Sequence, residues 1–279
     1  FNDKGFAKPQ MFLNLFISNA GLLVIAMGET IVMITAGIDI SVGSVTALVC
    51  MVAANQMENH GASAYTALLM ALVIGLLFGL VQGFLVSYLE IQPFIVTLAG
   101  MFFGRGMTSI ISTDMISIKN KTFLAWANYK IYLPIGSYSR RGKFIPAYIY
   151  PTVIIAILIF IVIAIIMKYT KFGREVYAIG GNAQSAMMMG LNVKKTKFKA
   201  YVLDGLLAGC GGFLFCLNSC SGFVEQAKGL EMDAISASVI GVTLLSGGVG
   251  TPFGTVFGVL IKGTISSLIT TQGTLSSWW

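Results

Sequence analysis

Long apolar runs are the feature that most constrains this chain. A helix that crosses a bilayer needs roughly 20 mostly apolar residues. Six stretches are of this kind, at 13–36, 65–88, 94–112, 148–167, 200–219 and 253–271. Two shorter apolar stretches, 42–56 and 234–246, are flanked by glycine-rich breaks. We predict an all-α fold, a polytopic transmembrane helical bundle with about eight membrane segments, because the runs are long and continuous rather than short and alternating.

The composition supports a single membrane domain over residues 1–279. Hydrophobic residues make up 56% of the chain and charged residues 10%, with a mean hydropathy of +0.83. Soluble domains carry about 25% charged residues, so an ordinary soluble enzyme is excluded. The net charge of +7 is explained by loop lysines and arginines near lipid headgroups, and we expect no nucleic-acid partner.

No catalytic or metal site emerges from the residue pattern. The single histidine, His60, follows Glu58 and Asn59 and has no partner at a catalytic or metal-binding spacing. The four cysteines lie in or beside apolar helices and are expected to be small buried residues. The chain has no G-x-x-x-x-G-K-[ST] loop, so we expect no nucleotide hydrolysis by this chain and no cofactor in it.

Two glycine-rich breaks interrupt the apolar pattern, Gly-Ile-Asp-Ile-Ser-Val-Gly at 37–43 and Ser-Gly-Gly-Val-Gly-Thr-Pro-Phe-Gly at 246–254. Non-helical backbone at membrane depth is tolerated only inside protein or beside a water-filled cavity, so broken segments point to a transport pathway. The alternative is a pair of tight turns, with Asp39 or Ser41 capping the next helix. The two interpretations are compatible. Glycine rows at 75, 79, 83 and at 250, 254, 258 predict close helix packing.

Three ionisable residues, Glu29, Arg105 and Lys262, fall near the middle of predicted membrane helices, and Asp204 lies nearer an end. Such groups are costly in a bilayer and mark pathways or ion pairs. Lys262 also continues the glycine row at 250–258. Our hypothesis is that Glu29 pairs with Arg105 or Lys262 beside the pathway; the alternative is structural pairing remote from any substrate.

A polar segment at 172–192 (Phe-Gly-Arg-Glu-Val-Tyr-Ala-Ile-Gly-Gly-Asn-Ala-Gln-Ser-Ala-Met-Met-Met-Gly-Leu-Asn) stands out in this apolar chain. Residues 183–189 can form a short helix with Asn182 as its N-cap and Gly190 as its terminator. Exposed methionines at Met187, Met188 and Met189 suit docking into a groove on a partner. Lysines at 194–199 would face lipid headgroups before the next helix.

Basic residues bear on the orientation of the chain. Seven crowd the segment around 168–199: Lys168, Lys171, Arg174, Lys194, Lys195, Lys197 and Lys199. Six fall in the segment 114–147: Lys119, Lys121, Lys130, Arg140, Arg141 and Lys143. Helix parity places the two segments on opposite sides, so one of them departs from the rule that basic loops are cytoplasmic.

The sequence resembles the permease subunits of ribose-type bacterial ABC sugar importers. The resemblance is carried by the break at 37–44, by Tyr-Ala-Ile-Gly-Gly-Asn at 177–182, and by Glu-Met-Asp-Ala-Ile at 231–235 through Gly-Gly-Val-Gly-Thr at 247–251. Within that family, Thr-Leu-Ala-Gly-Met-Phe-Phe at 97–103 and Gly-Thr-Leu-Ser-Ser-Trp-Trp at 273–279 are similar to a galactofuranose importer permease. The resemblance covers essentially the whole chain.

The resemblance implies a permease of about ten helices in the inner membrane, of which this chain lacks the first and the last. The segment 168–199 would be a cytoplasmic coupling loop and the segment 114–147 an extracytoplasmic loop. The coupling residues would be Gly181, Asn182, Ala183, Ser185, Met187, Met188, Met189 and Gly190. Glu29, Asp39, Ser41, Arg105 and Lys262 are the candidates for polar groups along the pathway.

The implied mechanism is alternating access, in which a separate ATPase subunit uses ATP and magnesium and moves the coupling helix. The other implied partners are a second permease subunit, identical or not, a periplasmic or lipid-anchored sugar-binding protein, and membrane lipids. The alternatives are a permease of the same superfamily for a branched-chain amino acid, a nucleoside or another small solute, and an ion-coupled secondary transporter, which would need no ATPase.

Overall fold

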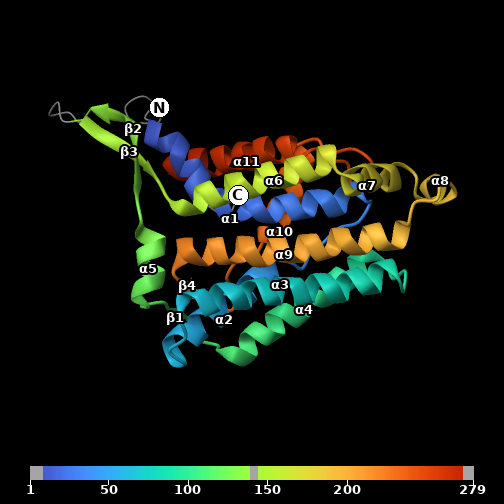
Figure 1. Cartoon of the computed structure of the whole chain (residues 1–279). Helices are drawn as coiled ribbons and strands as arrows, with labels where there is room; N and C mark the ends of the chain where they lie inside the picture. The colour runs from blue at the N-terminus through green and yellow to red at the C-terminus, as the bar shows by residue number, and fades with distance from the viewer. Residues whose placement is uncertain (1–8, 139–143, 273–279) are drawn as a thin grey trace.

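The computed structural model describes residues 9–138 and 144–272 and is predominantly helical. The helices are α1 (Pro9–Ile34), α2 (Val42–Asn59), α3 (Ala64–Ser87), α4 (Pro93–Ile111), α5 (Lys121–Asn128), α6 (Pro151–Tyr169), α7 (Lys171–Gly181), α8 (Ala183–Met188), α9 (Val193–Ser219), α10 (Leu230–Ile240) and α11 (Pro252–Gln272). Figure 1 shows the long helices side by side with roughly aligned axes, so the predicted helical bundle is confirmed.

Six of the described helices, α1, α3, α4, α6, α9 and α11, are long and apolar enough to cross a membrane. They correspond to the six long stretches predicted from the sequence. The shorter α2 occupies the predicted stretch 42–56 and is buried along most of its length. The existence of these helices is therefore confirmed, whereas the expectation of about eight membrane segments stays a prediction.

The two largest differences from the predicted helix boundaries are at the start of α9 and the end of α10. The helix α9 begins at Val193 rather than at residue 200, because the Asn192 side chain accepts a hydrogen bond from the backbone N–H of Lys195 at 2.9 Å and caps it. The lysines at 194–199 thus form its first turns. The helix α10 ends at Ile240 rather than at residue 246. Two residues after Ile240, Val242 takes a left-handed backbone conformation with φ of 67°.

The helix α9 lies at the centre of the bundle and contacts α1, α2 and α3. The glycine row of α3 faces it directly: a Cβ added at Gly79 would lie 2.6 Å from the carbonyl oxygen of Tyr201 and 2.9 Å from the Cα of Val202. The two backbones therefore approach as closely as the glycine spacing predicts. In lipid there is no hydrophobic driving force between helices, and close packing of this kind holds them together instead.

A hydroxyl group on α1 lies within hydrogen-bonding distance of hydroxyl groups on α10 and α11. The Thr30 hydroxyl on α1 lies 2.6 Å from that of Thr255 on α11 and 3.0 Å from that of Ser238 on α10, and all three side chains are buried. The glycine row of α11 packs on α10, where a Cβ at Gly258 would meet the nitrogen of Gly241 at 3.1 Å. Both predicted glycine rows thus act in packing.

The segment 114–147 carries structure that the sequence did not indicate. It contains α5 and the strand β1 (Ile116–Ser117), which pairs antiparallel with β4 (Ser221–Gly222) after α9. The antiparallel hairpin of β2 (Ile131–Tyr138) and β3 (Phe144–Ile149) completes it. A carboxylate oxygen of Glu58 at the end of α2 accepts the backbone N–H groups of Lys119 and Asn120 at 2.6 and 3.0 Å. Arg140, Arg141 and Lys143 fall outside the described residues.

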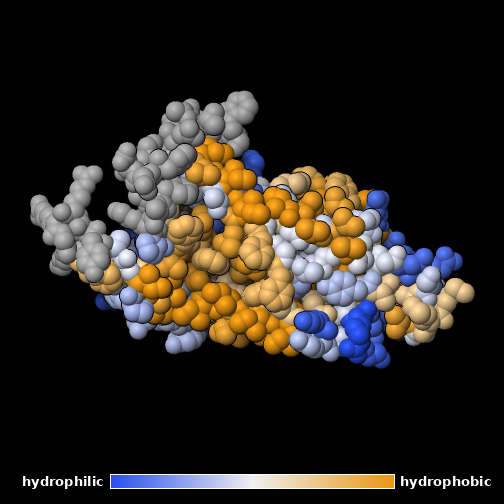
Figure 2. All heavy atoms as spheres, turned by 90° about the horizontal axis from the view of Figure 1, so that it is seen from above, coloured by the Kyte–Doolittle hydropathy of each residue, from blue (hydrophilic) through white to orange (hydrophobic). Residues whose placement is uncertain are grey.

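The surface of the described part carries a broad apolar band. Figure 2 shows it running along the molecule, with polar residues gathered toward the end that carries α7 and α8. On α6 most exposed residues are aliphatic, including Ile154, Leu158, Ile161, Val162 and Ile165. Large exposed apolar area of this extent on several neighbouring helices suits contact with lipid or with another membrane subunit.

Candidate functional site

The polar segment 172–192 forms α7, α8 and the turn into α9 at one end of the bundle. Figure 1 shows α8 projecting beyond that end, with the hairpin β2–β3 and α5 at the opposite end. A cavity of about 320 Å³ lies between α7 and the start of α9, and Lys171, Lys195 and Lys199 are among the residues that line it. This end of the molecule is therefore basic and presents a short helix to its surroundings.

The helix α8 forms as the sequence predicts. The Asn182 side chain accepts a hydrogen bond from the backbone N–H of Ser185 at 2.8 Å, so Asn182 is its N-cap. Gly190 ends it with φ of 81°, a conformation that glycine adopts without strain. The helix covers Ala183–Met188, one residue shorter than predicted, and Met189 takes the C-cap position.

The three methionines are exposed, as predicted. The exposed fractions of Met187, Met188 and Met189 are 61%, 86% and 68%, whereas Ala186 is fully buried against the molecule. Flexible, polarisable side chains gathered on a protruding helix are typical of a surface that docks into a partner. Gly181 at the end of α7, Ala183 and Ser185 complete this surface, which we call the α8 surface.

The helix α7 contacts the break at 246–254 and the end of α1. The Tyr177 hydroxyl donates to the carbonyl of Gly250 at 2.8 Å, and burial raises the pKa of this hydroxyl. The backbone N–H of Gly248 donates to the carbonyl of Ile34 at 2.9 Å, and Gly180 packs on both groups. The break at 246–254 therefore meets the end of α1 beneath α7, which links the α8 surface to the end of α1.

The break between α1 and α2 is a turn held by a hydrogen bond between a side chain and the backbone. A carboxylate oxygen of Asp39 accepts the backbone N–H of Ser41 at 2.7 Å. Ser41 occupies the N-cap position of α2 but its side chain does not cap the helix; its hydroxyl accepts a hydrogen bond from Gln82 on α3 at 2.8 Å. The predicted turn is present, but neither candidate side chain caps the first N–H groups of α2, since Asp39 binds the N–H of Ser41, the residue before the helix.

The proposed pairing of Glu29 with Arg105 or Lys262 is wrong. Lys262 forms an ion pair with Asp233 on α10 at 2.6 Å, since α11 packs on α10. The Arg105 guanidinium donates to the backbone carbonyls of Val224 and Gln226 at 3.0 and 2.6 Å. Sequence spacing cannot show which neighbouring helix faces such a residue.

Glu29 instead faces other carboxyl groups. One of its carboxylate oxygens accepts the backbone N–H of Asp39 at 3.2 Å. Asp204 on α9 lies beside Asp39, within hydrogen-bonding reach, and packs on α1 at Gly28. Sequence reasoning placed Asp204 near a helix end because it began α9 too late; with the start at Val193, Asp204 is well inside the helix. The sequence signal that could have placed Asp204 inside the bundle was a single acidic residue within an apolar run.

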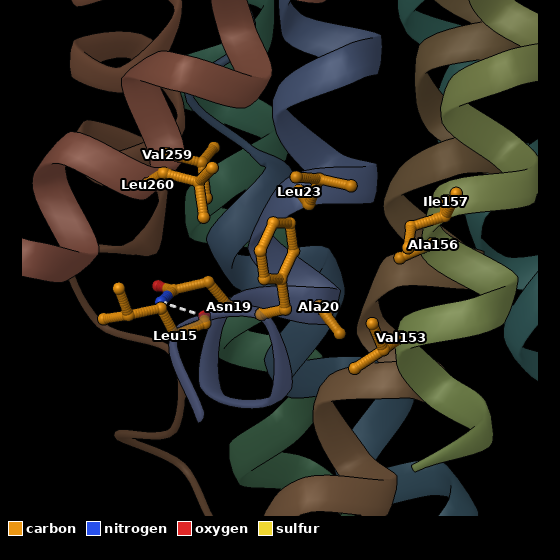
Figure 3. A pocket seen from close by; sticks show the side chains of 10 residues that line it. Leu15, Asn19, Ala20, Leu23, Val153, Ala156, Ile157, Val259 and Leu260 are labelled. Atoms are coloured by element: carbon orange, nitrogen blue, oxygen red, sulfur yellow. Dashed lines mark hydrogen bonds between the residues drawn. The ribbon is translucent and has the colours of Figure 1, made fainter. Parts of the chain in front are cut away.

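A small enclosed cavity inside the bundle offers no catalytic or binding groups. It lies between α1, α6 and α11, with a volume of about 10 Å³, close to the minimum for one water molecule. Figure 3 shows its lining to be apolar apart from Asn19, whose amide already donates to the carbonyl of Leu15 at 2.8 Å. Packing between three helices accounts for this cavity.

Comparison with known proteins agrees with this architecture. A model of the family described as the permease component of branched-chain amino acid transport systems matches residues 11–279. Among similar curated proteins is the inner membrane ABC transporter permease protein YjfF of Escherichia coli, 40% identical over 99% of this chain and 80% of that protein. No solved structure matches significantly.

Two further relatives carry sugar names. The fructose import permease protein FruG of Bifidobacterium longum is 34% identical over 95% of this chain and 76% of that protein. The ribose import permease protein RbsC of Bacillus subtilis is 35% identical over 98% of this chain and 81% of that protein. With the family match and the apolar helices, these similarities show that the chain is a multi-pass membrane protein and belongs to this family of ABC transporter permeases.

Proposed function

We propose that the protein is the transmembrane permease subunit of an ATP-binding-cassette importer that moves a monosaccharide across the bacterial inner membrane. The observation that carries the proposal is the α8 surface, a capped short helix with three exposed methionines at the basic end of an apolar bundle. A protruding helix of this kind suits a partner groove. Family membership supports a partner that hydrolyses ATP.

The α8 surface is proposed to bind the ATPase subunit. Its residues would transmit movement rather than contact sugar: Gly181, Asn182, Ala183, Ser185, Met187, Met188, Met189 and Gly190. The contacts of Gly180 and Tyr177 with the break at 246–254, and of Gly180 with Ile34, give that movement a route to the end of α1. ATP and magnesium would bind to the partner, not to this chain.

The orientation follows from charge. The segment 168–199 is proposed to face the cytoplasm, because its lysines gather at the α7–α8 end and basic loops favour that side. The segment 114–147, with α5 and β2–β3, lies at the opposite end (Figure 1) and would face outward, where a periplasmic or lipid-anchored binding protein delivers sugar. A second permease subunit, identical or not, would complete the passage within the lipid.

The five pathway candidates separate into two groups. Glu29, Asp39 and Ser41 lie together at the break, and all three are buried. Arg105 and Lys262 lie apart from them, each bound to its own partners. We propose that the break between α1 and α2, rather than Arg105 or Lys262, borders the passage and moves when α7 moves.

The proposed substrate is a monosaccharide, since relatives are named as ribose and fructose import permeases. Galactofuranose is the more specific proposal and rests on the resemblance at 97–103, on α4, and at 273–279, which lies outside the described residues. A branched-chain amino acid is the rival, in line with the description of the matching family. Competition between galactofuranose, ribose and leucine for uptake by the reconstituted complex separates them.

The test of the ATPase partner is a pull-down of the full-length permease with the ATPase subunit encoded beside it. The variant replaces Met187, Met188 and Met189 by serine and leaves the Asn182 cap and Gly190 intact. We expect wild type to retain the ATPase and the triple variant to lose at least tenfold of it, because the apolar contact surface is removed while the helix remains.

Met115→Ser is the matched control, because Met115 is 61% exposed at the opposite end of the bundle. It should leave ATPase retention unchanged. If wild type retained no ATPase, or if both variants behaved alike, the proposal would fail, and an ion-coupled transporter that needs no ATPase would become the better account of the buried carboxyl groups at the break.

A further inference from the structure

Three carboxyl groups from distant parts of the chain meet inside the bundle. Glu29 comes from α1, Asp39 from the break before α2, and Asp204 from the middle of α9. Their exposed fractions are 0%, 3% and 0%, so water does not reach them. Asp204 packs so closely on α1 that a Cβ at Gly28 would lie 3.0 Å from its Cα. The three groups therefore share one enclosed space.

Few donors serve these six oxygens. The backbone N–H of Asp39 reaches one oxygen of Glu29, and the backbone N–H of Ser41 reaches one oxygen of Asp39. The second oxygen of Glu29 and both oxygens of Asp204 are fully buried and receive no donor from the described residues. A buried polar group without a hydrogen bond is destabilising, and a buried charge without a partner far more so.

No basic side chain compensates the cluster within residues 9–138 and 144–272. The two basic residues in the middle of nearby helices are engaged elsewhere, Arg105 with backbone carbonyls and Lys262 with Asp233. The other titratable group at the cluster is Tyr201 on α9, whose hydroxyl donates to the carbonyl of Ile38 at 3.4 Å. The same described residues contain no cluster of three or more acidic, histidine or cysteine side chains that could hold a metal ion.

Asp39 and Asp204 nevertheless lie within hydrogen-bonding reach of each other. Ionised carboxylates only accept hydrogen bonds, so two of them can be joined only if one carries a proton. We propose that Glu29, Asp39 and Asp204 form a proton-binding site, in which a proton between Asp39 and Asp204 clamps the α1–α2 break onto α9. One carboxylate takes the proton from water when the site closes and returns it to water when the site opens; nothing is oxidised or reduced.

The site lies next to the contacts beneath α7. The break that carries Asp39 begins at the end of α1, where the carbonyl of Ile34 binds the N–H of Gly248 and packs against Gly180. A displacement of α7 would therefore pull on the clamp. This consequence rests on the proposed function of the α8 surface, whereas the proton site itself does not.

The first test is infrared spectroscopy of the full-length permease in lipid nanodiscs at neutral pH. Wild type should show the carbonyl band of a buried protonated carboxyl group, which shifts slowly in heavy water because the site is closed. The band should be lost in Asp204→Asn and in Asp39→Asn. Asp114→Asn, at an exposed carboxyl group, should leave it unchanged. A spectrum without the band, or one that neither site variant alters, would overturn the proposal.

The second test measures thermal unfolding against pH in wild type and in the isosteric variant Asp204→Asn. The folded site holds a proton that an unfolded carboxyl group gives up at neutral pH, so stability must fall as the pH rises. The Asn side chain in Asp204→Asn donates an N–H to Asp39 permanently. The unfolding temperature of this variant should equal that of wild type at low pH and should be higher than that of wild type at alkaline pH. Equal curves for the two proteins would contradict the proton site.

The two proposals fail separately. If wild type retained no ATPase in the pull-down while the infrared band was present, only the ATPase role would be wrong. An intact pull-down with no protonated carboxyl band would remove the proton site and leave the importer.

Discussion

Three charged side chains inside this bundle take their partners from the helix or loop that packs beside them. Lys262 reaches Asp233, Arg105 reaches two carbonyls after α9, and Glu29 reaches the break. A membrane interior makes such partners necessary, because water is absent and an unpaired charge is costly. Sequence alone identified Glu29, Arg105 and Lys262 as costly, but their partners depend on which helices become neighbours.

The ion pair between Lys262 and Asp233 should contribute to stability. Its atoms lie 2.6 Å apart, and the exposed fractions of the side chains are 28% and 35%. We expect Lys262→Met to lower the free energy of unfolding by about 1–2 kcal/mol, because it strands a half-buried carboxylate. Chemical unfolding in detergent measures this. The exchanged pair, Lys262→Asp with Asp233→Lys, should recover most of the loss; failure to recover would assign the effect to packing.

The pair of Glu90 and Lys194 gives a prediction on acid sensitivity. The Lys194 ammonium lies 2.7 Å from the Glu90 carboxylate, and the hydrogen bond and charge hold the pKa of Glu90 below its ordinary value. A lowered pKa stabilises the fold above the ordinary glutamate pKa, and this stabilisation disappears as pH falls through the folded pKa.

Glu90→Gln should therefore reduce the acid-induced fall in unfolding temperature slightly and leave behaviour at low pH unchanged. Both side chains are more than half exposed, so the difference should vanish in high salt. Unfolding scans at several pH values, with and without added salt, measure it. A difference that persisted in high salt would mean that Glu90 acts by another route.

At the scale of elements, short capped helices depend on single side chains. Asn182 alone caps α8 by accepting the N–H of Ser185. We expect Asn182→Ala to weaken the helix by about 1 kcal/mol, whereas Asn182→Asp should preserve it, since aspartate caps equally well. Hydrogen exchange at the Ser185 amide should rise in the alanine variant only. Equal exchange in both variants would show that packing of Ala186, not the cap, holds α8.

The close packing of α3 on α9 predicts a contrast between two glycines. Gly79→Ala places a Cβ 2.6 Å from the Tyr201 carbonyl oxygen, so the helices must separate and the unfolding temperature should fall. Gly106→Ala on α4 meets nothing within 4 Å, and alanine favours a helix over glycine by about 0.8–1.0 kcal/mol. This control should be neutral or stabilising. Similar losses in both variants would contradict the packing argument.

Elements differed in how far the sequence could predict them. The six long helices followed from hydropathy, and α8 followed from Asn182 and Gly190, because caps are local chemistry. The start of α9 was missed, since its lysines read as a headgroup-facing stop although lysine forms helices well. The hairpin β2–β3 and the pair β1–β4 depend on chain segments far apart, which no local pattern showed.

At the scale of the whole molecule, the two ends of the bundle differ in the elements that they carry. One end carries the basic α7–α8 segment, and the other carries α5 and β2–β3 (Figure 1). Between them the surface is a broad apolar band (Figure 2). The break at 246–254 connects the basic end to α1, and the three carboxyl groups join α1 to α9. This arrangement fits a permease driven from one face.

Site-specific photo-crosslinking tests the central claim most directly. A photoreactive residue at position 188 of the full-length permease, where Met188 is 86% exposed, should crosslink to the ATPase subunit in native membranes. The same residue at position 115, at the opposite end, should not. Crosslinking from 188 alone is the result that the account predicts. Crosslinking from 115 alone, or from neither position in an assembled complex, would contradict it.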